Sequence, residues 1–189
     1  VLHSFPTRRS SDLGQTQDAA ITALAHGATV TSSKDVNEEG NAVKKSVTVA
    51  LTAEPADSRS GTPTVYLGLD ADGKVIQAGY SAATASLGYG SLSFADAVKN
   101  EHIVEKTLRE AGVNVTDGSA KLPSDKTSYS TYASDGTTLV KENCSFNGTV
   151  DINGAAHTWS SVLMYDYSTA NASGNLADTV RIIYIYTTA

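Results

Sequence analysis

Residues 64–80 read Thr-Val-Tyr-Leu-Gly-Leu-Asp-Ala-Asp-Gly-Lys-Val-Ile-Gln-Ala-Gly-Tyr. Two extended runs, 64–70 and 74–80, flank an Ala-Asp-Gly turn at 71–73. An Asp-Gly pair between two runs rich in β-branched and aromatic residues is a strong short-range signal for a β-hairpin. This hairpin predicts an antiparallel sheet, and the rest of the chain can be organised around it.

Further extended runs lie on both sides of this hairpin. Residues 43–53 alternate apolar and polar side chains, and residues 29–33 alternate before them, so we expect a second hairpin there. An Asn-Gly turn at 153–154 predicts a third hairpin near the C-terminus. The extended segments of the second half are 128–132, 137–142, 149–152, 156–167 and 179–187.

One amphipathic helix is predicted over residues 93–112. Ser93 can cap its N-terminus, and Gly112 follows a last turn that carries Lys and Arg. With Gly112 in the left-handed conformation, Val113 can contact Leu108, as in a Schellman-type ending. The apolar stripe consists of Phe94, Val98, Val104, Leu108 and Ala111. One main helix packed on an antiparallel sheet built from hairpins predicts an α+β fold.

The chain divides into segments of different character. Residues 64–189 are expected to form one α+β domain, and residues 54–63, with two Pro, one Gly and three charged residues, are expected to be a loop or linker. Residues 14–53 are expected to hold a short helix and a hairpin. These would be either additional strands of the same sheet or the tail of a truncated upstream domain.

The first residues carry a different signal. Residues 2–13 resemble the translation of a common sequencing adapter, so we interpret residues 1–13 as an artefactual N-terminal segment outside the fold. On this interpretation the sequence is a fragment that holds neither the natural N-terminus nor a signal peptide region.

Composition limits the partners and the compartment. The 189 residues include 14 Lys and Arg against 20 Asp and Glu, and this acidic balance disfavours a nucleic acid as partner. No apolar run approaches the roughly 20 residues of a membrane-spanning helix, so no transmembrane segment is expected. Abundant Ser, Thr and Tyr with few basic residues are typical of β-rich bacterial proteins outside the cytoplasm, either secreted or in the cell envelope.

Aromatic residues gather in or beside the predicted strands. Because side chains alternate along a strand, Tyr165 and Tyr167 share one sheet face. Tyrosine combines an apolar ring with a polar tip, so such a face can stack on sugar rings or anchor a protein partner. The candidate partner-binding residues are Tyr129, Tyr132, Trp159, Tyr165 and Tyr167. The alternative is that this face is the core beneath the helix.

The last extended segment has apolar residues on both faces. Val180, Ile182, Tyr184 and Tyr186 share one face, and Arg181, Ile183 and Ile185 share the other. A strand with two apolar faces is expected at the centre of a sheet, with its tyrosines at least half buried.

Signals for catalysis are weak. His26, His102 and His157 lie in no recognisable nucleophile or metal-ligand motif. His102 lies in the predicted helix beside Glu101 and is expected to be a surface residue. We therefore expect no catalytic residue and no metal ligand, and enzymatic activity is the less favoured interpretation.

Residues 27–29 read Gly-Ala-Thr. This segment resembles the covalent flavin attachment motif of bacterial FMN-binding domains, in which a Ser/Thr-Gly-Ala-Thr sequence carries FMN on its last Thr. The resemblance implies that Thr29 is the acceptor, with Gly27 and Ala28 beside it. His26 stands where that motif has Ser or Thr, and the same residues also fit an ordinary strand.

Two classes of function remain open at this point. The first is a non-catalytic module of a secreted or cell-envelope protein, which binds a polymer or protein partner or acts as a structural spacer. It needs no cofactor and predicts exposed Tyr and Trp. The second is an FMN-carrying redox module with Thr29 as its attachment site, which requires room for the flavin ring near residues 27–31.

Overall fold

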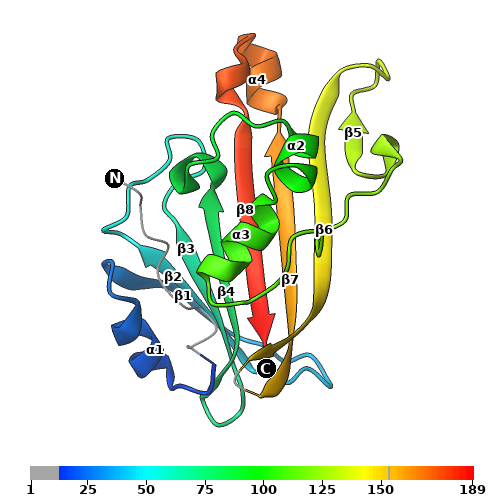
Figure 1. Cartoon of the computed structure of the whole chain (residues 1–189). Coiled ribbons are helices and arrows are strands. Elements are labelled where there is room, and N and C mark those ends of the chain that lie inside the picture. Colours follow the sequence, from blue (N-terminus) through cyan, green and yellow to red (C-terminus); the bar gives the residue numbers. More distant parts are fainter. Residues whose placement is uncertain (1–12, 153) are drawn as a thin grey trace.

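The computed structural model describes residues 13–152 and 154–189. The interpretation of residues 1–13 as an artefactual segment outside the fold lies outside the described residues except at Leu13, which is partly buried against the core. Eight strands form one antiparallel sheet in the order β1-β2-β3-β4-β8-β7-β6-β5 (Figure 1). The strands are β1 Ala28–Asp35, β2 Lys45–Leu51, β3 Thr64–Leu69, β4 Val75–Ala83, β5 Ser130–Tyr132, β6 Leu139–Ile152, β7 Ala155–Asp166 and β8 Val180–Thr188. The helices are α1 Gln17–Leu24, α2 Phe94–Lys99, α3 Ile103–Glu110 and α4 Ser168–Ser173. The predicted α+β fold with an antiparallel sheet is confirmed.

The hairpin of β3 and β4 turns where the sequence predicts. The Asp70 side chain accepts hydrogen bonds from the backbone N–H groups of Asp72 and Lys74, each at 2.9 Å. Gly73 has a φ of 75°, which glycine adopts without steric penalty. The carboxylate and the glycine together fix this turn.

The sheet consists of two meanders that meet at its centre. Strands β1 to β4 follow one another in space, and the chain then crosses through the helices and returns as β5 to β8. Strand β8 lies between β4 and β7, with Tyr80 opposite Ile185. The last strand is therefore central, as its two apolar faces indicate.

The segment 54–63 connects two neighbouring strands of this one sheet. Strands β2 and β3 pair without interruption from Lys45 opposite Leu69 to Ala50 opposite Thr64. Of the two alternatives left open for residues 14–53, the structure has the first, because their strands extend the sheet built by residues 64–189.

The single helix predicted over 93–112 is in fact two helices. Ser93 caps α2 by accepting a hydrogen bond from the Asp96 N–H at 3.2 Å, and the Val113 N–H donates to the Leu108 carbonyl at 2.9 Å in the expected ending of α3. Between the helices, His102 adopts the left-handed conformation with a φ of 50°.

The break between α2 and α3 reorients their apolar stripes. The buried residues of α2 are Phe94, Ala97 and Val98, and the buried apolar residues of α3 are Ile103, Val104 and Leu108. In one straight helix, at about 100° per residue, Val104 and Leu108 would fall beside the stripe of α2, but Ile103 would lie nearly opposite its centre. A straight helix could therefore not bury Ile103 together with the buried residues of α2.

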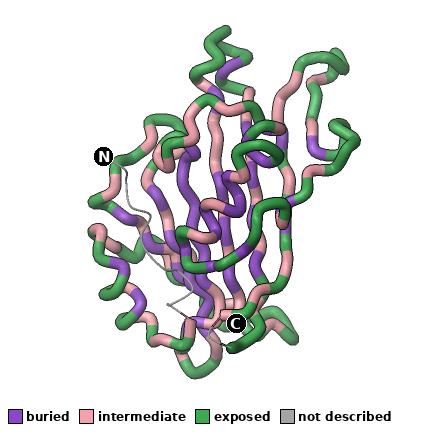
Figure 2. Tube along the Cα trace, viewed as in Figure 1, coloured by how far each residue is buried: buried purple, intermediate pink, exposed green. Residues whose placement is uncertain are grey.

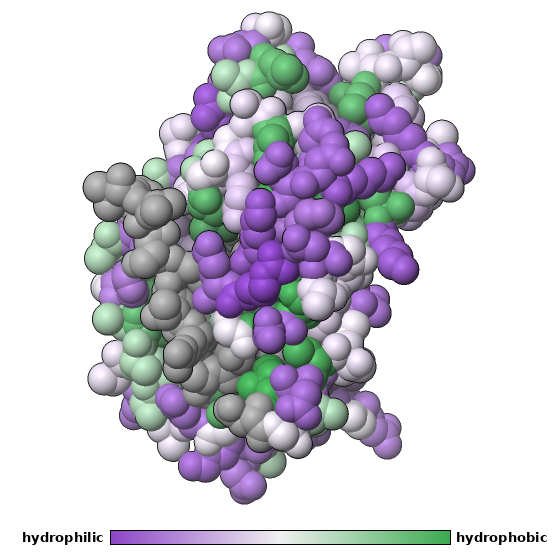
Figure 3. All heavy atoms as spheres, in the orientation of Figure 1, coloured by the Kyte–Doolittle hydropathy of each residue, from purple (hydrophilic) through white to green (hydrophobic). Residues whose placement is uncertain are grey.

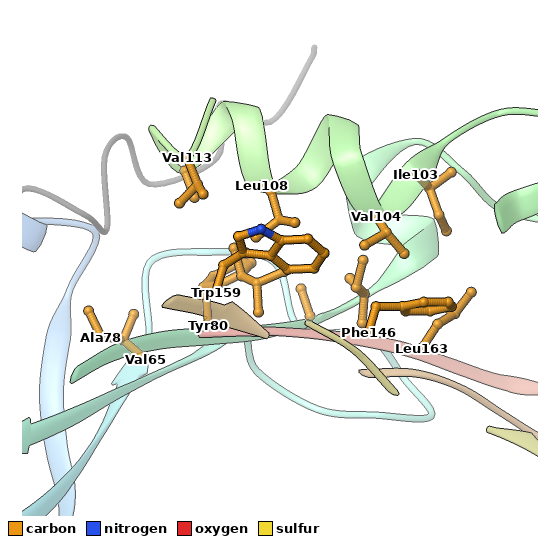
Figure 4. Close-up of a cluster of buried hydrophobic side chains, with 14 of the residues drawn as sticks. Val65, Ala78, Tyr80, Ile103, Val104, Leu108, Val113, Phe146, Trp159 and Leu163 are labelled. Carbon is orange, nitrogen blue, oxygen red and sulfur yellow. The ribbon is translucent and has the colours of Figure 1, made fainter. Parts of the chain in front are cut away.

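The core lies between the helices and one face of the sheet. Figure 2 shows buried segments concentrated in the central strands and in the helix that crosses them. In the close-up of Figure 4, Val104 and Leu108 point from α3 toward the sheet, where Trp159 and Tyr80 meet them. Burial of these large apolar side chains is the main favourable term that holds the layers together.

The outer surface of the helix layer is polar. In Figure 3, hydrophilic side chains gather across the middle of this side of the molecule, where α3 lies in Figure 1. Among the described residues, none of the helices has the length and apolar character needed to cross a membrane.

Candidate functional site

Three of the five candidate aromatic residues lie in the core. Trp159, Tyr165 and Tyr129 are 3%, 1% and 9% exposed. The ring of Phe94 packs edge-on against Tyr165 at 5.2 Å and stacks on Tyr129 at 5.5 Å, measured between ring centroids. The sheet face that carries these rings is the one beneath the helices, so they are not accessible to a partner.

The other two candidates differ from each other. The Tyr167 side chain is half-buried, and its hydroxyl donates a hydrogen bond to the buried Glu142 carboxylate. Tyr132 is 38% exposed on the short strand β5. The structure therefore does not bring all five residues together in one exposed surface.

Tyr165 and Tyr167 belong to a buried polar cluster with Glu142 and Arg181. The Arg181 guanidinium lies 5.2 Å from the centroid of the Tyr165 ring, and the Tyr165 hydroxyl donates to the Leu92 carbonyl at 2.9 Å. Burial raises the pKa of Tyr165 to about 12. Burial also raises the pKa of Tyr167, and its hydrogen bond to Glu142 raises this pKa further. Both phenols stay neutral near pH 7 and anchor the core.

The opposite side of the sheet offers a different aromatic surface. In Figure 1, α2 and α3 lie on one side of the sheet, and the residues that alternate with the core residues point away from them. We call this surface the open face. It is formed by Thr48, Thr64, Tyr66, Ser81, Ser145, Asn147, Ser160, Val162, Met164, Ile182, Tyr184 and Tyr186.

The ring of Tyr186 lies over the sheet at the centre of the open face. Tyr186 is opposite Gly79 in the pairing of β4 with β8, and a Cβ at Gly79 would lie 2.6 Å from the Tyr186 Cε1 atom. The rings of Tyr66 and Tyr186 are 6.0 Å apart between centroids, and the Tyr66 hydroxyl is 3.1 Å from the Ser81 hydroxyl. Strands β3 and β8, which lie on either side of β4, thus place Tyr66, Tyr184 and Tyr186 in one half-buried group.

The centre of the open face is uncharged. Strand residues with charged side chains on this side lie only near strand ends, namely Lys34, Lys141, Asp151 and Asp166. Burial, followed by the nearby Tyr66 and Tyr184, raises the pKa of Tyr186 to about 12. Near pH 7 the open face therefore presents neutral rings, hydroxyls and amides.

A small hollow borders the open face. It has a volume of about 120 Å³ and is lined by strand residues together with residues 60–62 of the preceding loop. Tyr66 and Tyr184 form part of its wall. Most of the open face is otherwise a broad sheet surface and not a deep pocket.

Thr29, the residue implied as a flavin acceptor, lies at the start of edge strand β1. Its side chain is exposed, and its hydroxyl donates to the Gly27 carbonyl at 3.0 Å. Gly27 has a φ of 68° and packs closely against Thr52. A cavity of about 350 Å³ lies beside Glu54, which contacts His26, but residues 27–31 do not line it.

Sequence reasoning missed a third group of residues. His102, Glu105 and Asp117 come together where the loop after α3 returns to the start of that helix. The signal in the sequence is a His and a Glu three residues apart on a helix, with the Glu among apolar positions.

The fold and the open face define a two-layer α+β protein with helices on one side of an antiparallel sheet and a half-buried aromatic surface on the other. No protein-family model, curated protein or solved structure matches the chain.

Proposed function

We propose that the protein is a non-catalytic module of a bacterial secreted or cell-envelope protein, and that it binds a neutral polysaccharide on the open face. The observation that carries this proposal is the half-buried group of Tyr66, Tyr184 and Tyr186 within a surface whose strand residues are uncharged at its centre. The acidic, tyrosine-rich composition supports a location outside the cytoplasm.

The chemistry of the open face suits sugar rings. A tyrosine ring offers an apolar surface on which the C–H face of a sugar can stack, and its hydroxyl can bond sugar hydroxyls. Small polar side chains such as Ser145, Asn147 and Ser160 continue the surface from the rings across β7 and β6 and supply further donors and acceptors. A charged polymer would find no counter-charge at the centre of this surface, so a neutral one is favoured.

The shape of the open face suits a polymer better than a small molecule. Small ligands are generally enclosed in cavities of roughly 300–1,000 Å³. The hollow next to Tyr66 and Tyr184 is only about 120 Å³, whereas the open face continues across several strands. A flat surface of this kind can contact several consecutive sugar units.

Affinity electrophoresis through gels that contain neutral or acidic polysaccharides tests the proposal. We expect at least one neutral polysaccharide to retard the protein, and Tyr66→Ala and Tyr184→Ala to remove most of the retardation. Tyr89→Ala is the matched control, because Tyr89 packs against the core on the helix side. Retardation by acidic polymers alone would contradict the proposal, and so would an equal loss of retardation in Tyr89→Ala. Binding to a protein partner and to no polysaccharide would also contradict it.

The flavin-carrying redox module is the second candidate function. It is supported by the exposed hydroxyl of Thr29, which a flavin transferase could reach without unfolding the sheet. It makes a separate prediction, which is given in the Discussion.

A further inference from the structure

Glu105 is a buried carboxylate with an unused oxygen. The residue is 0% exposed in the first turn of α3. Its Oε2 accepts a hydrogen bond from the Gly118 N–H at 3.2 Å and lies 3.0 Å from the His102 Nδ1. Its Oε1 is also buried and has no hydrogen-bond partner among the described residues. A buried carboxylate oxygen without a partner is costly, so native proteins rarely retain one without a reason.

Two further ligand-bearing side chains surround this carboxylate. His102 precedes α3, and Asp117 lies on the loop that follows it. One nitrogen of His102 and one carboxylate oxygen from each of Glu105 and Asp117 lie within 4.8 Å of one another. The three side chains thus converge although Asp117 is distant from His102 in the sequence.

The local backbone holds these residues in place. His102 has φ 50° and ψ 43°, a conformation that is uncommon for a residue other than glycine. On the other side, Arg109 donates a hydrogen bond to the Val115 carbonyl at 2.9 Å and lies 2.8 Å from the Asp117 carboxylate. The strained residue and the tethered loop both direct their side chains to the start of α3.

The charges around the group favour a cation. Glu105 and Asp117 bring two carboxyl groups to this site. Among the described residues, Arg109 is the cation that contacts Asp117, and Lys106 lies 3.8 Å from Glu101 in a separate pair. By formal charge, the two carboxylates outnumber the one guanidinium beside them.

We propose that His102, Glu105 and Asp117 form a binding site for a divalent transition-metal ion of the Zn²⁺ type. An imidazole nitrogen favours such ions, and carboxylate oxygens complete their coordination. Ligand atoms bound to one ion at about 2.0–2.2 Å lie roughly 3.0–3.5 Å from each other. The 3.0 Å between His102 and Glu105 already matches this spacing.

Asp117 completes the site by a small movement. The Asp117 side chain is 51% exposed. The three ligand atoms lie within 4.8 Å of one another, and this distance exceeds the spacing of ligand atoms around one ion by only about 1–2 Å. When the ion binds, Asp117 exchanges its contact with Arg109 for the metal. Three protein ligands leave one position for water or a further ligand. The site lies on the helix side and is independent of the polysaccharide proposed for the open face.

Calorimetric titration of the tag-free, chelator-treated chain with Zn²⁺ tests the site, and Ca²⁺ serves as the comparison ion. We expect one Zn²⁺ per chain, with Ca²⁺ bound at least about tenfold more weakly because it prefers oxygen ligands. His102→Asn and Asp117→Asn should each weaken Zn²⁺ binding by about 10-fold to 100-fold. Asparagine keeps access to the left-handed conformation of residue 102. Asp117 is the main test position because its side chain is exposed, whereas a substitution of the buried Glu105 could prevent folding.

His26→Asn is the matched control. His26 also has a positive φ, 48°, and also contacts a glutamate, with 2.9 Å between its Nδ1 and the Glu54 Oε1. This variant should bind Zn²⁺ as the unmodified chain does. Zn²⁺ should also raise the melting temperature of the unmodified chain but not that of Asp117→Asn. No Zn²⁺ binding, or binding that survives both His102→Asn and Asp117→Asn, would overturn the proposal.

Discussion

Gly79 and Tyr186 form a cross-strand pair between β4 and β8, and the ring of Tyr186 lies directly over Gly79. The φ of Gly79 is not in the left-handed region, and it is the ring, not the backbone, that requires the absence of a side chain. On the other face Trp159 covers its own cross-strand partner, Gly148, whose added Cβ would lie 2.8 Å from the indole nitrogen. Each face of the sheet thus has an aromatic ring seated on a glycine, an arrangement that protects glycine-containing strands.

Gly79→Ala should destabilise the protein by about 1–3 kcal/mol, because the added methyl group forces the Tyr186 ring out of its position. The same substitution in a Tyr186→Ala background should have a smaller effect, since the ring is no longer there to collide. Urea unfolding of the two single variants and the double variant measures this coupling.

Gly148→Ala provides the control on the opposite face. It should destabilise the chain by a similar amount, because the added methyl group collides with Trp159, but it should leave polysaccharide binding unchanged. Gly79→Ala should reduce both the stability and the polysaccharide binding. Additive effects of Gly79→Ala and Tyr186→Ala would show that the ring does not rest on this glycine.

Tyr165→Phe should lower the free energy of unfolding by about 1 kcal/mol, because it removes the hydrogen bond from the phenol to the Leu92 carbonyl. Polysaccharide binding should not change, since the Tyr165 ring is 1% exposed beneath the helices. Thermal denaturation and affinity electrophoresis of the same preparation check both statements. A loss of binding without a loss of stability would place the ligand on the helix side.

Alkaline pH should destabilise the fold through its buried phenols. The folded pKa of Tyr186 is raised to about 12 by burial, and an unfolded tyrosine has a pKa of about 10. The neutral phenol is thus favoured in the folded state, so this contribution to stability is complete below pH 10 and is lost as the pH rises from 10 to 12. Tyr165, whose pKa is also raised to about 12, adds to the same window.

Tyr186→Phe separates the contribution of Tyr186 to this pH dependence from that of Tyr165. Urea unfolding at pH 8, 10 and 11.5 should show a shallower decline in this variant than in the unmodified chain, because one ionising group is gone. Identical declines would mean that Tyr186 titrates alike in the folded and unfolded states.

Local pattern in the sequence was sufficient for much of the sheet. The Asp-Gly turn predicted the β3–β4 hairpin, the Asn-Gly turn predicted the β6–β7 hairpin, and the two apolar faces of 179–187 indicated a central strand. Alternation also placed Tyr165 on the same face as Tyr167, and Tyr184 on the same face as Tyr186. It could not tell which of these faces the helices cover, because that depends on where α2 and α3 pack after the strands have assembled.

The helix break and the group at its end needed three-dimensional information. Ser93 and Gly112 marked the outer ends of the helical region correctly. The residues around His102 do not predict its left-handed backbone conformation. Glu105 falls among the apolar positions of the predicted helix, but that position alone does not show that its carboxylate lies beside His102. Its convergence with Asp117 is a contact across a loop, which periodicity within one element does not encode.

The flavin alternative makes a prediction that is independent of the open face. Residues 14–189, exported from a bacterium that has a flavin transferase, should carry an FMN-sized mass increment and absorb visible light if Thr29 is modified. Thr29→Ala should lose both, and Thr31→Ala on the same edge strand should keep both. An unmodified, colourless chain would contradict the redox function.

Nuclear magnetic resonance with ¹³C-labelled tyrosine and ¹⁵N-labelled tryptophan tests the polysaccharide proposal most directly. On titration with an oligosaccharide of the polymer that retards the protein, the ring signals of Tyr66, Tyr184 and Tyr186 should shift together, and the Trp159 indole signal should stay in place. This follows because Trp159 lies on the opposite side of the sheet, 3% exposed beneath α3. Shifts confined to Trp159 and the helix side, or unshifted signals of the three tyrosines at saturation, would contradict the proposed function.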